Sequence, residues 1–334
     1  MIPYWVGALI VTLVVCCYVT LGGMRGTGWT NFVQSIIFLA GGIIIFFMVA
    51  YALGGFSTAT QNVAEKYPFL MDRSHFPMKL FFSYGIIVTL AVPLFPQVFI
   101  RLLTGKRPKE LKKVSLIYPV AGLLIWFIVA YLGMWGHLPF PDLKAGEADK
   151  ILPMLLSKYA PIWMVGLLGA AIFAALFSSL DAQLLTLCTM VIKDFILFIR
   201  KKEFTEKKEV SLSRLLVIIF AVIAFIAALI QPKGIITIIE WSFGGYACMF
   251  IPLIAALYWK RCTKQAAFWS IITSQFVLLA IPLGILPKEI SFGMLPGIPG
   301  LLVGIATLVV ITFLTPGPDK ETTDKFFADI QITD

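Results

Sequence analysis

The sequence predicts an all-α polytopic membrane protein with about nine transmembrane helices. Of its 334 residues, 59% are hydrophobic and only 13% are charged, whereas a soluble domain of this size carries about 25% charged residues. The apolar runs are long and unbroken, which favours membrane helices over the roughly ten-residue alternating segments of a membrane β-barrel.

Nine apolar runs each meet or approach the roughly 20 residues that a helix needs to cross a bilayer. They lie near residues 4–22, 32–54, 79–103, 116–135, 161–185, 213–231, 235–258, 266–286 and 294–314. We expect the fifth helix to continue to about Ile199, past the membrane. The runs predict a transmembrane domain at residues 1–318, followed by a cytoplasmic tail at residues 319–334.

Basic residues gather in alternate loops, and this distribution predicts orientation. The loops after the third, fifth and seventh runs are strongly basic, as in Arg101, Lys106, Arg107, Lys109, Lys112 and Lys113. Because cytoplasmic loops carry an excess of Lys and Arg, we expect the N-terminus outside and the C-terminus in the cytoplasm. The net charge of +9 is then a topology signal in a bacterial-type inner (plasma) membrane, and no nucleic-acid partner is expected. Arg25 alone marks the first inner turn. No basic segment precedes the first run, so no cleavable signal peptide is expected.

The fifth run carries polar residues in its middle, where hydrocarbon makes them costly and a functional site is the default hypothesis. Ala175, Ser178 and Ser179 fall on one helical face. Small residues flank that face and allow another backbone to come close. Two hydroxyls beside a carbonyl suit a hard cation, which binds oxygen. The residues alone leave a second interpretation open, in which each serine bonds a carbonyl of its own helix.

Two further stretches have unusual residues for a membrane span. Pro93 and Pro96 interrupt the third run and predict a broken helix, of the kind that forms solute and ion sites in transporters, or else an ordinary proline kink. Glu240 lies near the outer part of the seventh run. It is either an interfacial carboxylate or the partner of a polar group in an outward-facing vestibule.

The sequence lacks the motifs of the common enzyme classes. It has no HExxH, no phosphate-binding glycine loop, no Ser/His/Asp arrangement and no cysteine pair at zinc spacing. We therefore expect neither an enzyme nor a bound cofactor.

Several segments, in order along the chain, together resemble the sodium:solute symporter family. Residues 18–34, YVTLGGMRGTGWTNFVQ, resemble that family's "Y-x-x-x-GG-x-x-x-x-x-WTD-x-x-Q" pattern, with Asn31 where the family usually has Asp. Residues 149–153, DKILP, followed by AAIFAALFSSLDAQLL, resemble its "DK-x-x-P … A-x-x-S-[ST]-L-x-x-Q" pattern. Residues 257–264 and 315–318 resemble its "WKR-x-T" and "LTP-x-P" segments.

The resemblance implies a LeuT-type inverted-repeat fold and uptake of a small organic solute coupled to Na⁺. The family's second sodium site would correspond to the Ala175 carbonyl and the Ser178 and Ser179 hydroxyls. Solute contacts would come regionally from the broken helix and the seventh span, at Thr89, Val92, Pro93, Gln97, Ile239 and Glu240. The aliphatic segment from Thr89 to Pro93 argues against a sugar and leaves a carboxylate or an amino acid.

The resemblance is partial. Counted back from the serine helix, the first two spans correspond to the fourth and fifth helices of the family's ten-helix core. The first three core helices are then missing, and a cation would have about three protein ligands where five or six oxygens are usual. We therefore expect an incomplete or split symporter, with the N-terminal helices as a possible partner chain besides Na⁺, the solute and the bilayer. The alternatives are a symporter-like membrane sensor domain and a non-transporting fragment with a structural role.

Overall fold

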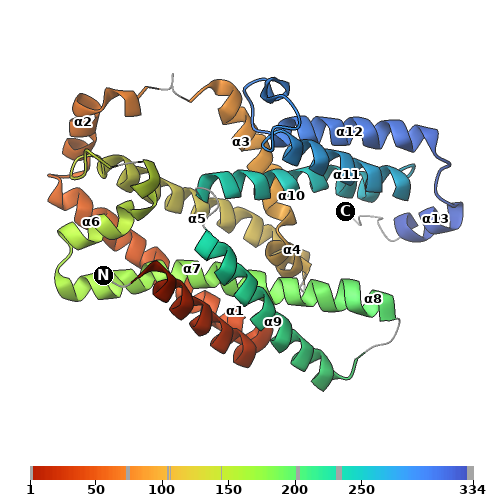
Figure 1. Cartoon of the computed structure of the whole chain (residues 1–334), viewed down its shortest axis with the longest axis horizontal. Coiled ribbons are helices and arrows are strands. Elements are labelled where there is room, and N and C mark those ends of the chain that lie inside the picture. Colours follow the sequence, from red (N-terminus) through yellow and green to blue (C-terminus); the bar gives the residue numbers. More distant parts are fainter. Residues whose placement is uncertain are drawn as a thin grey trace. The chain divides into compact units, whose positions relative to one another are not determined.

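The computed structural model describes residues 3–72, 76–103, 105, 107–143, 145–200, 204–230 and 235–328, and the regular elements in this part of the chain are helical (Figure 1). The α-helices are α1 (Tyr4–Ala52), α2 (Phe56–Lys66), α3 (Met78–Ala91), α4 (Pro96–Leu103), α5 (Pro108–Trp135), α6 (Ile151–Tyr159), α7 (Ile162–Met190), α8 (Leu197–Arg200), α9 (Glu206–Ile230), α10 (Ile235–Tyr258), α11 (Lys264–Ala280), α12 (Gly297–Leu314) and α13 (Lys320–Ala328). The all-α membrane prediction is confirmed.

Fewer spans appear than the nine expected. Within the described residues, seven helices are long and apolar enough to cross a membrane, or up to eight if the bent pair of Met78–Leu94 and Pro96–Leu103 forms one span. The run expected at 266–286 forms α11, which has only 17 residues and ends at Ala280. Pro282 cannot continue the helical hydrogen bonding, and Gly284 follows in a turn with φ of +75°. These two residues explain the early end.

The first two expected spans merge into α1. The helical conformation is interrupted at Gly23, with φ of 55° and ψ of −160°, a conformation that glycine adopts without the steric penalty of a Cβ. The second span begins at Gly26 rather than at residue 32, and runs to Ala52. The side chain of Arg25, expected to mark this turn, lies outside the described residues.

The serine-bearing helix is much longer than a bilayer requires. α7 continues through one π-helical segment, Val191–Ile196, into α8. Together they form a run of 39 residues from Ile162 to Arg200, or roughly 58 Å at 1.5 Å per residue. The prediction of one helix reaching about Ile199 is confirmed.

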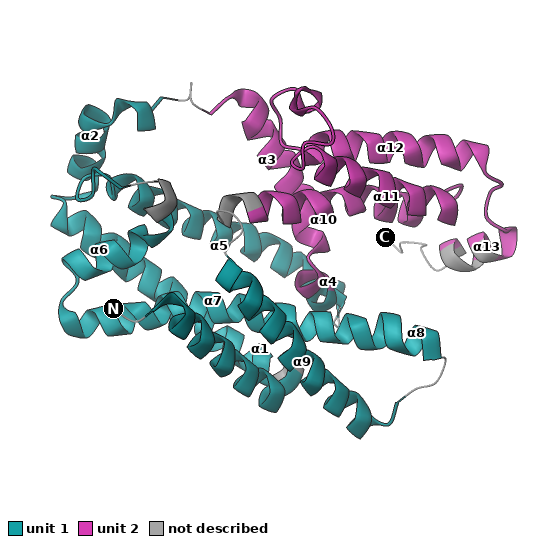
Figure 2. Cartoon of the chain, viewed as in Figure 1, with its two compact units in different colours: residues 1–72, 100–232 teal, residues 73–99, 233–334 magenta. Residues whose placement is uncertain are grey.

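The chain divides into two compact units (Figure 2). Unit 1 comprises Met1–Asp72 and Ile100–Pro232, and in it α1 packs against α7, α9 and α5. Its largest fully buried side chain is that of Trp135 on α5. The indole Nε1 donates a hydrogen bond to Thr60 Oγ1 at 3.3 Å, and the rings of Phe46, Phe56 and Tyr131 surround it with centroids 5.2 to 5.5 Å away.

Unit 2 comprises Arg73–Phe99 and Lys233–Asp334, and in it α12 packs against α10 and α11. Small residues bring these helices together. A Cβ added at Gly300 on α12 would lie only 2.9 Å from the carbonyl oxygen of Ser274 on α11. One turn away, Ser270 Oγ donates to the carbonyl oxygen of Gly304 at 2.8 Å. Close backbone approach with small residues and interhelical hydrogen bonds is typical of membrane helix pairs.

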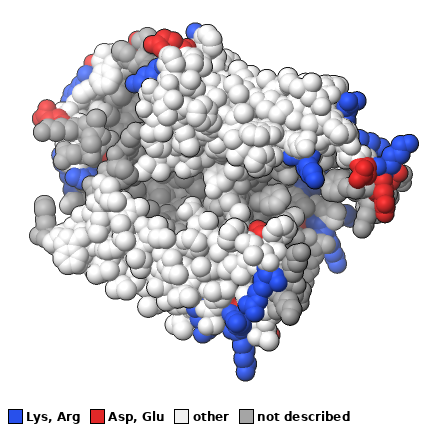
Figure 3. All heavy atoms as spheres, turned by 45° about the vertical axis from the view of Figure 1, so that its right-hand side comes forward, with Lys and Arg blue, Asp and Glu red and all other residues white. Residues whose placement is uncertain are grey.

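The surface has the apolar composition of a membrane-embedded protein. Most side chains in view in Figure 3 are uncharged, and the Lys, Arg, Asp and Glu side chains in view are few. Large apolar side chains are exposed along the helices, including Ile162 at 93%, Tyr51 at 88% and Leu21 at 81%. Apolar exposure on this scale marks a membrane or interaction surface.

Candidate functional site

The predicted cation ligands lie in the middle of α7, in unit 1. Ser178 is half-buried and its Oγ donates a hydrogen bond to the carbonyl oxygen of Ala175 at 3.0 Å. Ser179 is exposed among the described residues. The Ser178 hydroxyl and the Ala175 carbonyl oxygen are therefore within hydrogen-bonding distance of each other, and the third predicted ligand, Ser179, is exposed. The same geometry also fits the alternative in which a serine bonds its own helix.

The small face of α7 does bring another backbone close. A Cβ added at Gly41 on α1 would lie 2.4 Å from the Cβ of Ala171. One turn further along α7, Ala175 lines an apolar cavity of about 200 Å³ together with Gly42 of α1 and Ile128 of α5. The helix that carries the serines is therefore held tightly against α1 on this face.

A buried polar cluster lies one turn beyond the serines. Asp181 is 0% exposed and Asn31 on α1 is 7% exposed. The Asn31 carboxamide and the Tyr18 hydroxyl lie near the Asp181 carboxyl. Within the described part of the chain, neither carboxyl oxygen of Asp181 and neither polar atom of the Asn31 carboxamide has a hydrogen-bond partner. Tyr18 instead donates to the carbonyl oxygen of Phe177 at 3.3 Å.

The third predicted span is broken, as expected. α3 ends at Ala91, a 3₁₀ turn covers Val92–Leu94, and α4 starts at Pro96 with a bend of 50°. Phe95 at the break places its ring against those of Phe243 and Tyr246 on α10, with centroids 4.8 and 5.2 Å away. In the predicted solute region, Thr89 and Pro93 are exposed, whereas Val92 and Gln97 are half-buried.

Glu240 on α10 has a polar partner on the broken span. It is half-buried, and its Oε1 accepts a hydrogen bond from the hydroxyl of Tyr84 on α3. Its neighbour Ile239 is exposed. The Tyr84 ring stacks on Phe76, with centroids 5.9 Å apart. Unit 2 thus joins the broken span to α10 through an ionisable residue and through the aromatic contacts at the break.

Replacing Tyr84 with phenylalanine is expected to weaken unit 2 modestly. The change removes the hydroxyl that donates to Glu240 and leaves a half-buried carboxylate oxygen without a protein donor. A hydrogen bond to a charged group contributes about 1.5 to 3 kcal/mol. The measurement is urea unfolding of the purified chain in detergent micelles, followed by tryptophan fluorescence. Tyr258→Phe is the control because Tyr258 is 69% exposed, and an equal effect of both substitutions would contradict the prediction.

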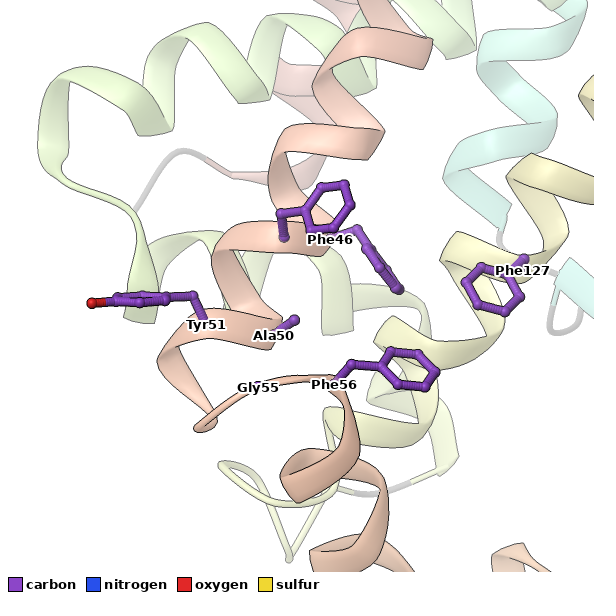
Figure 4. A pocket seen from close by; sticks show the side chains of 7 residues that line it. Phe46, Ala50, Tyr51, Gly55, Phe56 and Phe127 are labelled. Carbon is purple, nitrogen blue, oxygen red and sulfur yellow. The ribbon is translucent and has the colours of Figure 1, made fainter.

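One apolar cavity in unit 1 does not have the chemistry of a solute site. It has a volume of about 440 Å³ and is lined by Phe46, Phe47, Ala50, Tyr51, Gly55, Phe56 and Phe127. In Figure 4 the rings of Phe56 and Phe127 lie next to each other, and the centroids of these stacked rings are 6.2 Å apart. None of these side chains carries a charge, so the cavity offers nothing to pair with a carboxylate or an ammonium group.

Comparison with known proteins identifies the family. A family model described as "Sodium:solute symporter family" matches residues 1–274. The chain belongs to the sodium:solute symporter family. The family match covers α1, the broken span, α7, α10 and most of α11, so it includes every predicted site residue.

Curated relatives are named as transporters. The chain is 27% identical to a sodium/pantothenate symporter of Haemophilus influenzae over 92% of its own length and 64% of the relative's. It is 28% identical to the sodium/pantothenate symporter of Escherichia coli, covering 97% of this chain and 68% of that one. It is 26% identical to the high-affinity proline transporter PutP of Bacillus subtilis, covering 97% of this chain and 68% of that one. The chain therefore spans about two thirds of the length of these relatives.

A solved structure shows the fold. The chain matches a Na⁺-coupled sialic acid symporter, determined in a substrate-bound outward-open state, with a TM-score of 0.75 and 21% identity. The match covers 96% of this chain and 68% of that one. The fold is therefore of the LeuT-like type of this family, as the sequence predicted.

The structure adds one group of residues that the sequence analysis did not include in the site. The family pattern has a carboxylate at the position of Asn31, and here the carboxylate of Asp181 lies beside that position from the facing helix. The signals were present separately, as an Asp inside a membrane helix and as a departure from the WTD pattern. Only the packing of α1 on α7 brings them together.

Proposed function

We propose that this chain works in a sodium-coupled symporter that takes up a small organic solute, such as a carboxylate or an amino acid. The observation that carries the proposal is the arrangement on α7, where the Ser178 hydroxyl lies 3.0 Å from the Ala175 carbonyl oxygen and Ser179 is open beside them. Family membership supports the same function. The N-terminus would face outward and the C-terminus the cytoplasm, in a bacterial-type inner membrane.

Binding of the cation would replace a hydrogen bond within α7 by contacts between the cation and oxygen atoms. Na⁺ takes oxygen ligands, so binding would replace the Ser178 to Ala175 hydrogen bond with two oxygen contacts and add that of Ser179. Three protein oxygens are fewer than the five or six that hard cations usually take. The other ligands would be water and residues beyond these three. Binding would fix the middle of α7 and shift the population toward one conformation of the transporter.

The solute would be bound at the broken span and α10, in the region of Thr89, Val92, Pro93 and Gln97 and of Ile239 and Glu240. Interrupted helices expose backbone groups that bind solutes in many transporters. The turn is aliphatic and aromatic, with Phe95 packed on Phe243, and Glu240 supplies a carboxylate. This composition suits a small, partly apolar solute better than a sugar.

Uptake measurements test the function directly. Inverted or right-side-out membrane vesicles with the full gene product would be given labelled pantothenate, proline and glucose, with an imposed Na⁺ gradient or an equal K⁺ gradient. We expect Na⁺-driven accumulation of a carboxylate or amino acid and no accumulation of glucose. Accumulation that is the same with Na⁺ and K⁺ would contradict the proposal, as would glucose uptake alone.

A further inference from the structure

A second cavity in unit 1 lies at the end of three spans where basic residues gather. Its volume is about 300 Å³. It is lined by Val19, Thr20 and Gly23 of α1, by Leu185, Thr189 and Ile192 of α7 and its π-helical continuation, and by Glu206, Glu209, Val210, Ser213, Arg214 and Val217 of α9. The transport proposal does not use these residues, although Val19, Thr20 and Gly23 belong to the family-like stretch at residues 18–34.

The cavity has two chemically different parts. One wall is aliphatic, formed by Val19, Leu185 and Val217 among others. The other carries hydroxyl, carboxylate and guanidinium groups. A ligand that satisfies both parts must be amphipathic. All three helices are long and apolar enough to cross a membrane, so a membrane lipid is an amphipathic ligand within reach of this cavity.

Arg214 is positioned to bind a phosphate. Its Nε donates to the carbonyl oxygen of Thr20 at 3.0 Å. That carbonyl lies one turn before the interruption of α1 at Gly23, so the contact fixes the guanidinium at the break. The two terminal nitrogens of the guanidinium have no partner among the described residues, and neither has the nearby hydroxyl of Ser213. Arginine matches phosphate geometry well because its planar fork presents parallel donors.

Two carboxylates in the cavity favour one kind of phosphate-bearing headgroup over another. Glu206 and Glu209 line the same cavity as Arg214, and Glu209 also pairs with Lys193 at 2.9 Å. A purely anionic headgroup would be repelled by these two carboxylates. A headgroup that carries an ammonium group beside its phosphate can instead pair that group with these carboxylates. From Glu206 to Arg214 the helix rises about 12 Å, a distance that two long side chains and a headgroup span together.

We propose that this cavity binds an ethanolamine phospholipid, with its phosphate at Arg214 and Ser213, its ammonium group at Glu206 and Glu209, and the upper part of an acyl chain along the aliphatic wall. The lipid links α1, α7 and α9 at the break in α1 and beside the π-helical segment of α7. The proposal does not depend on transport, because it concerns the lipid that the chain retains.

Native mass spectrometry of the full chain tests the proposal. The purified chain in detergent is titrated with phosphatidylethanolamine, phosphatidylglycerol or phosphatidylcholine of equal acyl composition, or with water-soluble phosphoethanolamine. Arg214→Gln is expected to weaken retention of phosphatidylethanolamine about 10-fold, since one charge-assisted hydrogen bond contributes roughly 1.4 kcal/mol or more. Glu206→Gln with Glu209→Gln is expected to remove the preference over phosphatidylglycerol. Lys207→Gln is the matched control, because Lys207 is exposed on the same helix outside the cavity.

Each outcome decides the question. Retention of phosphatidylethanolamine above the other two lipids, lost in Arg214→Gln and kept in Lys207→Gln, supports the site. Equal retention of phosphatidylglycerol overturns it, and so does binding of soluble phosphoethanolamine as tight as that of the lipid. If Arg214→Gln fails to fold by circular dichroism, Arg214→Lys replaces it. This charge-retaining variant should bind phosphatidylethanolamine more weakly than the wild type does, and equal binding by the two overturns the proposal. Unchanged binding in every variant also overturns the proposal.

Discussion

Replacing Ser178 and Ser179 together with alanine is expected to abolish the Na⁺ dependence of solute uptake. The double substitution removes two of the three oxygens that α7 offers to a cation and leaves only the Ala175 carbonyl, which then has no side-chain donor beside it. If each lost ligand weakens binding by about 1.4 kcal/mol, the affinity for Na⁺ falls roughly 100-fold. The measurement is the initial rate of uptake across a series of Na⁺ concentrations at constant ionic strength.

A matched control separates this effect from the general cost of removing hydroxyls from membrane helices. Thr12 and Ser115 each bond a carbonyl of their own helix, at 2.8 and 2.9 Å. The Thr12→Ala and Ser115→Ala double variant should keep the wild-type Na⁺ dependence. Uptake that responds to Na⁺ identically in both double variants would reject the assignment of the serines and leave family membership as the remaining support for a sodium-coupled mechanism.

Replacing Gly41 with leucine is expected to destabilise unit 1 by about 3 kcal/mol, the upper end of the usual range for overpacking. A Cβ at this position would lie 2.4 Å from the Cβ of Ala171. The clash is with a short, rigid side chain, so α1 and α7 must move apart. The serine segment of α7, one to two turns further on, would move with it, and Na⁺ binding should fall as well.

The neighbouring glycine gives the control for this substitution. A Cβ added at Gly42 meets no atom within 4 Å, although both residues lie in the same turn of α1. Gly42→Leu should therefore leave stability unchanged or raise it, because leucine has a better helix propensity than glycine by roughly 0.8 kcal/mol. The measurement is the midpoint of urea unfolding in micelles. Equal destabilisation by both substitutions would show that α1 and α7 do not approach as closely as described.

Features that depend on one helix alone were predictable from the sequence. The length of the serine helix follows from an apolar run that continues in a helical pattern to Arg200, and the break before Pro96 follows from two prolines in one span. Both signals act within a few residues, so tertiary contacts do not change them. The early end of α11 also has a local cause, Pro282 followed by Gly284, which the hydropathy of residues 266–286 concealed.

Features that depend on two helices were not predictable in the same way. The sequence left Glu240 as either an interfacial carboxylate or the partner of a polar group in an outward-facing vestibule, and nothing local indicates that Tyr84, 156 positions away, donates a hydrogen bond to it. Asp181 and Asn31 are separated by 150 positions, and nothing local indicates that their side chains face each other. The cavity at Arg214 is formed by three helices. In the sequence, Glu206, Glu209 and Arg214 look like ordinary charged residues beside a loop, and only the packing of the helices places them around one cavity.

The run from α7 through the π-helical segment into α8 forms a single long rod. Ser178 and Arg200 are 22 residues apart, or about 33 Å along the axis. A tilt of about 10° centred on the serines would carry the far end of the rod some 6 Å sideways, by simple geometry on that length. A cation that fixes the middle of the rod would thereby govern the position of its far end at Arg200.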